Sequence, residues 1–556
     1  MARLKYNFTW KKYHRWFGLV LSVFMLVFCV SGIILNHREA FSGCEVSRKW
    51  LPASYHIKNF NNGVVKGTVV KKSGSLAISE GFSDSILVYG CAGVFLTDYQ
   101  LSTWQDFNAG LPKSIDERNV RHLVQARDGS LWCAALRDVY RYDENSQGWK
   151  KVELPGNEER IMDVALGKDS MVVVALTRSR VFTMIPFVQY GEIGKIGKSS
   201  SETYRVESKI IPAPKKYESK TTLFKLVWHL HSGEFFGLPG KLVVDAIALV
   251  LIVLSITGIL LLILPYGIRR AKKLAAKARM KRLGKQFAWN MKWHNKIGYV
   301  TIVLTLWIAI TGMCLRPPLM VPLVLSKLPQ AVGEDGNVWQ DKLRAIRWDA
   351  VQGDWLVSTS EGFLRVDEDF SQAPKMLPDD ECPKLSPMGV TVWESDGKGG
   401  WIVGSFRGIY RWNPVNHSLN QILDYFTGKP SEETSMIPIS DNLVCGYSED
   451  FLGGKPLVFD FAKGVKDAKG QAVALCNDEP KTSRNEESMS DLICETAPMS
   501  LWNVALELHV GRCYSPFLGP LSDLFVFLSG LLITLVLLSG YIISHRRRKK
   551  AQVRLK

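Results

Sequence analysis

Several signatures of common enzyme classes are missing from the 556 residues of this chain. The ten cysteines include no Cys-x-x-Cys pair, so a zinc or thiol-redox site has little support. No P-loop and no Ser-His-Asp signature is present. Gly191, Gly194 and Gly197 form a glycine string, but without the strand–helix context that a dinucleotide site requires. These absences argue against nucleotide-dependent enzymes and serine hydrolases.

Acidic residues are absent from three short segments that are rich in lysine and arginine. The segments are 1–15, 265–296 and 545–556, and they hold 23 of the 70 basic residues. The rest of the chain has a slight excess of acid, so the formal net charge of +17 reflects where the cations lie. Cations that flank apolar spans stay on the cytoplasmic side of a membrane. The charge therefore indicates topology and gives no argument for a nucleic-acid partner.

Four apolar stretches of about 20 residues exclude a purely soluble protein, because about 20 such residues cross a bilayer as a helix. We expect a multi-pass protein of a bacterial inner membrane, with both termini in the cytoplasm and two large periplasmic segments. The first span has no cleavage site after it and is interpreted as an uncleaved anchor. The expected parts are a cytoplasmic N-terminus with the first span (1–37), a periplasmic β-domain (38–240), the second span (241–264), a basic cytoplasmic loop (265–296), the third span (297–316), a second periplasmic β-domain (317–520), the fourth span (521–544) and a basic cytoplasmic tail (545–556).

The cysteines are distributed in a way that fits this topology. Cys29 and Cys314 lie within spans, and eight others lie in the two outer segments. An even number of cysteines in an oxidising compartment permits disulfides, although the spacing does not give their connectivity.

The two halves of the chain share a pattern, which indicates an internal duplication. The first and third spans open with His14 and His294, each followed by glycine four residues later and by a hydroxyl-glycine pair that ends 18 residues later. The second and fourth spans are each preceded by a Leu-His-x-Gly sequence, at His231 and His509. Each half is therefore a helix, a long outer segment and a second helix.

Histidines gather at the membrane boundaries and are candidates for the axial ligands of haem iron. The duplication pairs His14 with His294 on the inner side and His231 with His509 on the outer side. His37 and His545, each five residues after a Ser-Gly pair, could replace one member of a pair, which leaves six candidates for four positions.

Asp245 and Asp523 follow the outer histidines by 14 residues and could orient a ligating imidazole. The alternative is that boundary histidines only anchor helices at the headgroups. We interpret His56, His122 and His417, in the outer segments, as ordinary surface residues.

The outer segments contain short alternating runs separated by turn residues, which predict β-strands. Related runs, such as those around Trp132 and Trp401, recur about every 40 residues, a period typical of propeller blades. We expect about three blades in each segment, which either join in one six-bladed ring or form two separate β-domains. Both tryptophans are interpreted as blade core. The predicted fold class is a four-helix transmembrane bundle from two duplicated hairpins, each with a large all-β, propeller-like insertion.

The residues that open and close the spans resemble the PepSY-associated transmembrane helix family. The resemblance rests on the motifs Lys-Tyr-His-Arg-Trp-Phe-Gly at His14, Ser-Gly-Ile-Ile-Leu-Asn-His ending at His37, Leu-His-Ser-Gly at His231 and Trp-His-Asn-Lys-Ile-Gly at His294. The outer repeats resemble two-component-regulator propeller repeats and depart from the family's usual small periplasmic domains. The resemblance implies an inner-membrane protein of iron uptake, with two b-type haems, that reduces ferric siderophores.

The function expected from these features is a haem-b oxidoreductase that moves electrons across the membrane. Quinol or a cytoplasmic donor would supply electrons to a periplasmic ferric siderophore or another Fe(III) chelate, in partnership with an outer-membrane iron-uptake system. No catalytic residue is assigned. The alternatives are a periplasmic ligand-binding or sensing protein and a component of a siderophore or haem permease.

Overall fold

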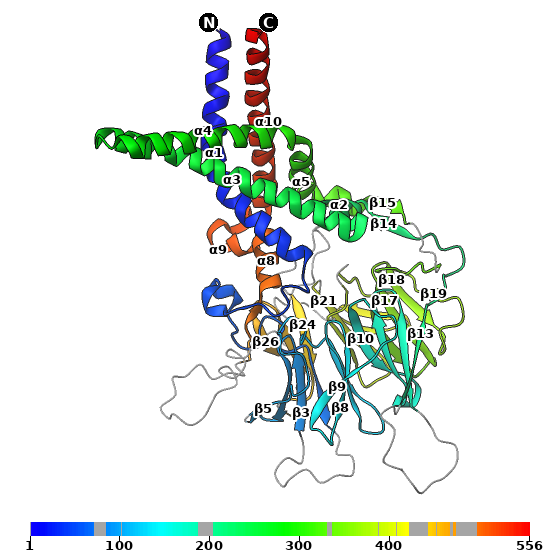
Figure 1. Cartoon of the computed structure of the whole chain (residues 1–556). Helices are drawn as coiled ribbons and strands as arrows, with labels where there is room; N and C mark the ends of the chain where they lie inside the picture. The colour runs from blue at the N-terminus through cyan, green and yellow to red at the C-terminus, as the bar shows by residue number, and fades with distance from the viewer. Residues whose placement is uncertain are drawn as a thin grey trace, which may run out of the picture. The chain divides into compact units, whose positions relative to one another are not determined.

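A computed structural model of the chain describes residues 2–71, 85–101, 103–186, 204–330, 336–386, 389–406, 408–421, 443–451, 453–467, 471–473 and 497–555. The chain forms two compact units, each assembled from separate stretches of sequence (Figure 1). The helical unit comprises 1–41, 220–330 and 501–556, and the β unit comprises 42–219 and 331–500. Each half of the duplicated sequence therefore contributes to both units.

Helices account for most of the helical unit. They are α1 (Ala2–Asn36), α2 (Leu223–Ser232), α3 (Gly237–Lys273), α4 (Lys277–Val300), α5 (Ile302–Cys314), α6 (Met320–Leu325), α8 (Leu501–His509), α9 (Ser515–Leu518) and α10 (Ser522–Leu555). Single 3₁₀ turns, at Glu234–Phe236, Arg512–Tyr514 and Gly519–Leu521, connect the short helices to the long ones. Two short strands, β14 (Lys220–Thr222) and β15 (Lys327–Pro329), pair antiparallel.

Three of the described helical segments are long and apolar enough to cross a membrane, namely Trp10–Asn36, Glu234–Lys273 and Arg512–Lys549. The expected third span falls instead on α4 and α5, which meet at a 68° bend and pass the same test only together. The bend lies at Thr301, whose hydroxyl donates to the carbonyl of Ile297 at 2.9 Å. Such back-bonding by threonine competes with the helical ladder and favours bending.

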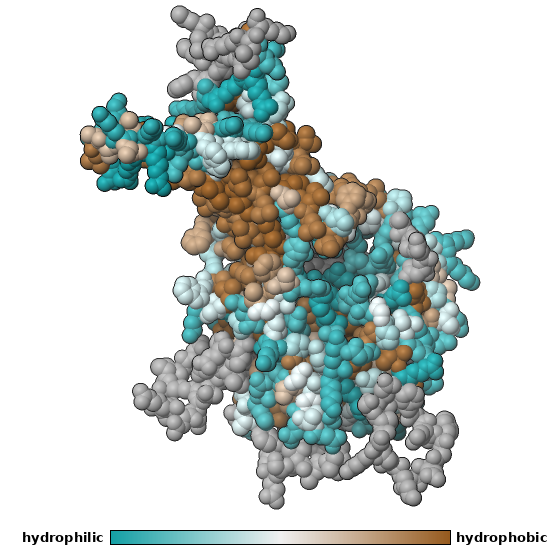
Figure 2. Space-filling view, in the orientation of Figure 1, coloured by the Kyte–Doolittle hydropathy of each residue, from teal (hydrophilic) through white to brown (hydrophobic). Residues whose placement is uncertain are grey.

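The basic segment 265–296, which we expect to connect the second and third spans in the cytoplasm, is almost entirely helical. α3 continues to Lys273 and α4 begins at Lys277, so two helices carry these cations. Figure 2 shows hydrophilic residues along much of α4 and apolar residues over the long helices that adjoin it. Inside the unit, one apolar cluster joins α1, α3, α5 and α10 through residues that include Cys29, Leu251, Trp307 and Leu537.

Within its described residues, the β unit contains six antiparallel sheets of three or four strands, each a meander of strands that are consecutive in sequence. Three come from the first half: β2–β5 (Gly67–Lys71, Ser85–Gly90, Gly93–Asp98, Trp104–Asp106), β6–β9 (His122–Gln125, Leu131–Ala134, Val139–Asp143, Gly148–Val152) and β10–β13 (Ile161–Leu166, Val173–Thr177, Val181–Pro186, Tyr204–Lys209). Three come from the second half: β16–β19 (Leu343–Asp349, Asp354–Thr359, Gly362–Val366, Lys375–Met376), β20–β23 (Val392–Ser395, Trp401–Ser405, Gly408–Asn413, Ser418–Gln421) and β24–β26 (Val444–Ser448, Leu457–Asp460, Gly464–Asp467). A short pair, β1 (Glu45–Val46) and β27 (Met499–Ser500), joins the two ends of the unit.

Every one of these six sheets shares apolar cores with two others. Five buried clusters join consecutive sheets, from the first to the sixth. A further cluster joins the sixth sheet to the first and contains Phe95 from β4 and Phe459 from β25. Trp132 is 4% exposed and lies in the core between the second and third sheets, as the sequence predicts.

Cysteine pairing is not observed in the described part of the chain. Cys44, Cys91, Cys133, Cys382, Cys445 and Cys513, among the outer-segment cysteines, are free thiols. Cys476 and Cys494 lie outside the described residues, as do Gly191, Gly194 and Gly197.

Candidate functional site

Four of the six candidate histidines meet in two pairs within the helical unit. The ring centroids of His14 and His294 are 6.3 Å apart, and those of His231 and His509 are also 6.3 Å apart. These are the two pairings that the duplication predicts. In each pair one residue comes from each half of the chain.

Local structure differs between the pairs but is the same for the two members of a pair. His14 and His294 lie within long helices, α1 and α4. His231 and His509 lie at the ends of the short helices α2 and α8. Gly233 and Gly511 follow two residues later with φ of 77° and 85°, a left-handed conformation that ends a helix and strongly favours glycine. The glycine of the Leu-His-x-Gly motif therefore turns the chain toward the next long helix.

A hydroxyl group from another helix holds Nδ1 of each imidazole. The contacts are His14 with Ser539 (3.0 Å), His294 with Thr257 (2.9 Å), His231 with Thr311 (3.0 Å) and His509 with Ser31 (2.9 Å). Each hydroxyl also donates to a carbonyl of its own helix. The hydroxyl hydrogen is thereby used, so the oxygen accepts from Nδ1–H. All four imidazoles are then the tautomer with a free lone pair on Nε2, the state that a metal ligand requires.

A glycine follows each of these hydroxyl residues and faces the edge of the same imidazole. A Cβ at Gly312 would lie 2.8 Å from Cε1 of His231, and one at Gly540 would lie 2.9 Å from Cε1 of His14. The corresponding distances at Gly32 and Gly258 are 3.4 Å from His509 and 3.5 Å from His294. The hydroxyl-glycine pair is therefore a cradle for one imidazole, with the hydroxyl on Nδ1 and the glycine against the ring edge.

The cradles cross between the two halves of the chain. His14 of the first half lies on Ser539 of the second, and His294 of the second half lies on Thr257 of the first. The outer pair repeats this exchange. Three of the four hydroxyl-glycine pairs stand out in the sequence, but Thr257-Gly258 was missed. The second and fourth spans each contain a hydroxyl-glycine pair, but Thr257 follows Asp245 by 12 residues and Ser539 follows Asp523 by 16, so the spacing did not match them.

His37 and His545 are not brought to any other histidine of the described chain. Nε2 of His37 lies 2.6 Å from the carboxylate of Asp245, and the ring of His545 stacks on Tyr299 and Tyr541. Asp245 thus contacts a histidine outside both pairs. Asp523 lies 3.9 Å from Arg316, so neither aspartate orients a paired imidazole as the sequence analysis suggested.

The paired imidazoles fit the ligand set of a b-type haem. Imidazole nitrogens bind transition metals at about 2.0–2.1 Å, the zinc value being representative. An ion bound at that distance to two Nε2 atoms would fit between rings whose centroids are 6.3 Å apart. The two metal–nitrogen bonds and the two distances from Nε2 to the ring centroid together make up this separation. Glycine at each cradle leaves room beside the ring edge, where a side chain would stand.

A family model for the PepSY-associated TM region matches residues 3–264 and again residues 262–548. The chain belongs to this family. The two successive matches agree with the duplication inferred from the spacing of the histidines. No curated protein matches the chain.

Solved structures with detectable similarity to this PepSY-associated protein include two extracellular domains from B. thetaiotaomicron. One is described as part of a hybrid two-component system and the other as part of a one-component system, at 10% and 11% sequence identity. Each comparison has a TM-score of 0.32 and covers 72% of this chain. The chain spans about a third of the length of those structures, 32% in each case.

Proposed function

We propose that this protein is a haem-b oxidoreductase of a bacterial inner membrane, which reduces a periplasmic ferric siderophore or another Fe(III) chelate. The observation that carries the proposal is the repetition of one arrangement four times. An imidazole presents Nε2, a hydroxyl fixes Nδ1, and a glycine leaves space at the ring edge. Helix anchoring at headgroups requires neither paired imidazoles nor a shared tautomer.

The proposal assigns one haem to His14 and His294 and a second to His231 and His509. Haem iron between two imidazoles supplies one-electron transfer. The hydroxyls of the cradles hold the rings in place and leave Nε2, the nitrogen that would bind the iron, unprotonated. They also raise the basicity of the imidazoles through the Nδ1–H contact.

The two pairs lie toward opposite ends of the long helices. His14 and Ser31, which contacts the outer histidine, are 17 residues apart on α1, a rise of about 26 Å. The apolar cluster of α1, α3, α5 and α10 includes Cys29 and Trp307 from this part of the helices. In the proposed topology the basic helix ends place the His14 pair at the cytoplasm and the His231 pair at the periplasm. The apolar interior then separates them and excludes water.

Electrons are proposed to enter on the cytoplasmic side, from quinol or another donor, and to leave on the periplasmic side. One electron converts Fe(III) in a chelate to Fe(II), a less charged and softer cation that hard oxygen ligands hold less strongly. The six sheets, each sharing cores with two neighbours, are proposed to form one propeller on the periplasmic side.

The test is a dithionite-reduced minus oxidised absorption spectrum of the detergent-purified protein, with haem counted per chain. We expect a b-type spectrum and two haems. His14→Ala and His231→Ala should each leave about one haem, whereas His37→Ala and His545→Ala should leave two. A wild-type protein without haem after expression in haem-replete cells would overturn the proposal. Two haems in His14→Ala would overturn the ligand assignment.

A further inference from the structure

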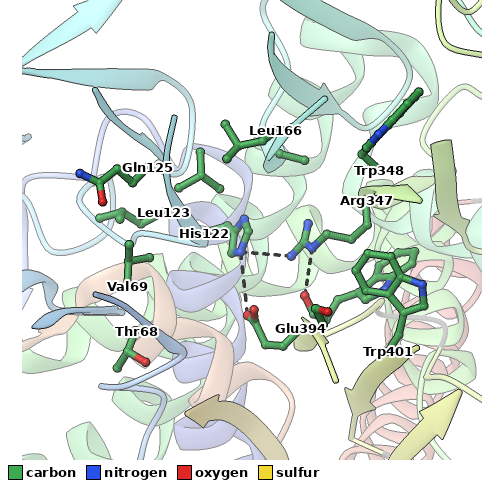
Figure 3. Close-up of a pocket in the computed structure, with 14 residues that line it drawn as sticks. Thr68, Val69, His122, Leu123, Gln125, Leu166, Arg347, Trp348, Glu394 and Trp401 are labelled. Atoms are coloured by element: carbon green, nitrogen blue, oxygen red, sulfur yellow. Dashed lines mark hydrogen bonds and ion pairs between the residues drawn. The ribbon is translucent and has the colours of Figure 1, made fainter. Parts of the chain in front are cut away.

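A cavity of about 290 Å³ lies in the β unit, where the first strands of five sheets face one another (Figure 3). β2, β6, β10, β16 and β20 supply most of its lining. Its polar lining includes His122, Arg347 and Glu394, and its aromatic lining consists of Trp348, Trp393 and Trp401. The sequence analysis took His122 for a surface residue and Trp401 for core. His122 instead lies beside the cavity on β6, whereas Trp401 on β21 packs against the core of its sheet as predicted and also borders the cavity.

Arg347 forms hydrogen bonds with both His122 and the nearby Asp163, so these three side chains make one network. Arg347 donates to Oδ2 of Asp163 at 2.6 Å, to Nε2 of His122 at 3.2 Å and to the carbonyl of Trp393 at 2.9 Å. Nδ1 of His122 donates to the carbonyl of Val164 at 2.6 Å. Burial, and then the charge of Arg347, lowers the pKa of His122 to about 4, against the opposing effects of Asp163 and Val164. His122 is therefore neutral, and the charges of Arg347 and Asp163 neutralise each other.

Glu394 is different, because its carboxylate has no hydrogen bond from the described part of the chain. Its nearest ionisable contact is Nε2 of His122 at 4.0 Å, beyond hydrogen-bonding length. The side chain is 38% exposed and points toward His122 inside the cavity (Figure 3). Desolvation by the strands that surround the cavity raises the pKa of Glu394 to about 7, Arg347 opposes this shift, and the charges of Asp163 and Asp450 add to it. Among the residues that the structure describes, no lysine or arginine forms an ion pair with this carboxylate.

Three indole side chains form the aromatic part of the cavity lining. Trp393 is 2% exposed and adjoins Trp401, with ring centroids 6.1 Å apart. Trp348 borders the cavity on the side of Arg347 (Figure 3). Indole faces attract organic cations through the quadrupole of the ring, most strongly where water is excluded. An anion would have few hydrogen-bond donors in this cavity, because Arg347 already donates four hydrogen bonds within the protein.

We propose that this cavity binds a small organic cation, a primary amine or guanidinium, with its charge on the Glu394 carboxylate and its carbon chain against the tryptophans. The size agrees, since ligand cavities begin at roughly 300 Å³. The inference does not depend on haem in the helical unit, and it holds whether or not the proposed reductase activity is found.

The test uses the full-length protein in detergent, with 1,4-diaminobutane as the probe and 1,4-butanediol as its neutral analogue. Binding is measured by calorimetry and by the change in tryptophan fluorescence. We expect the diamine to bind and the diol to bind at least tenfold more weakly. Glu394→Gln should weaken diamine binding at least tenfold. Glu381→Gln is the matched control, because Glu381 also contacts a histidine, the exposed His417 at 2.6 Å, away from the cavity lining.

The pH dependence of diamine affinity distinguishes binding to the Glu394 carboxylate from nonspecific electrostatic attraction. Diamine affinity should fall between pH 8 and pH 6, as Glu394 takes up a proton, and Glu394→Gln should lose this dependence. Trp401→Leu should weaken diamine binding but retain its dependence on pH. Equal affinity for diamine and diol, equal affinity in wild type and Glu394→Gln, or no binding at millimolar diamine would each overturn the proposal. A melting temperature close to that of wild type shows that each variant is folded.

Discussion

At the residue scale, four glycines lie against the edges of imidazole rings, and this proximity can be tested without removing any ligand. Gly312→Ala places a methyl group 2.8 Å from Cε1 of His231, closer than carbon atoms can approach. We expect His231 to be displaced and, if the protein holds the two haems proposed above, the haem content to fall toward one per chain, measured by absorption after purification. Gly18→Ala is the matched control, because its nearest neighbour is Val536 at 3.8 Å. Full haem content in Gly312→Ala would show that the cradle does not fix the ring.

His122 and Glu394 give opposite contributions to stability in acid. The pKa of His122 is lowered to about 4, below its unfolded value near 6.5, so the unfolded chain takes up its proton first and stability falls as pH drops from 6.5 to 4. The pKa of Glu394 is raised to about 7, above its unfolded value near 4.3. Its folded form holds the extra proton, so stability rises as pH drops from 7 to 4.3. The two effects oppose each other between pH 4.5 and 6.5.

Glu394→Gln should therefore make the protein more sensitive to acid. Removing the carboxyl leaves the His122 effect alone, so the melting temperature of the variant should fall relative to wild type as pH drops from 6.5 to 4.5. The measurement is thermal unfolding followed by tryptophan fluorescence at several pH values. Parallel curves for the two proteins would contradict the prediction.

At the element scale, the sixth sheet depends on the first for its core. Phe459 of β25 is fully buried in the cluster that joins these sheets, whereas Phe461, two residues later, is 40% exposed. Phe459→Ala should lower the free energy of unfolding of the β unit by about 3–5 kcal/mol, because it leaves a cavity between two sheets. Phe461→Ala should cost much less. Limited proteolysis and thermal unfolding measure the difference, and similar losses in both variants would argue against a shared core.

Sequence reasoning succeeded where a local pattern determines the element. Repeated alternation gave the strands, and the matched spacing gave the pairing of His14 with His294 and of His231 with His509. It failed where a distant part of the chain decides the outcome. His122 was interpreted as a surface residue, yet Arg347, 225 positions later, forms a hydrogen bond with it inside the β unit. Nothing local in Thr257-Gly258 shows that a helix of the other half brings an imidazole to it.

Secondary structure in the basic segment was missed for a similar reason. The lysines and arginines of 265–296 were used to predict topology alone, but lysine and arginine are also good helix formers. The mutual packing of α3 and α4 turns the segment into two helices. The bend at Thr301 likewise lies inside an apolar run that reads as one straight span.

At the scale of the whole molecule, the proposed topology predicts where reagents reach the chain. Cys44 is an exposed thiol at the start of the β unit. It should react with a membrane-impermeant maleimide in intact spheroplasts, and Cys44→Ser should lower that labelling, which sets the baseline for the next variant. Gly284→Cys on α4, tested in the Cys44→Ser background, should react only after lysis. Labelling of Gly284→Cys in intact spheroplasts would reverse the assigned orientation.

The crossing of the cradles also bears on how such a protein can evolve. One helical hairpin carries a histidine for each end and a hydroxyl-glycine pair for each end, but its own histidines lie on the hairpin of the other half. A single hairpin could therefore complete both sites only as a two-fold symmetric dimer. Once the halves are fused in one chain, each constrains the other. Replacing a hydroxyl residue in one half requires a compensating change at the histidine that it contacts in the other half. Divergence is then free in the strands and restricted at the four histidines and the four hydroxyl-glycine pairs.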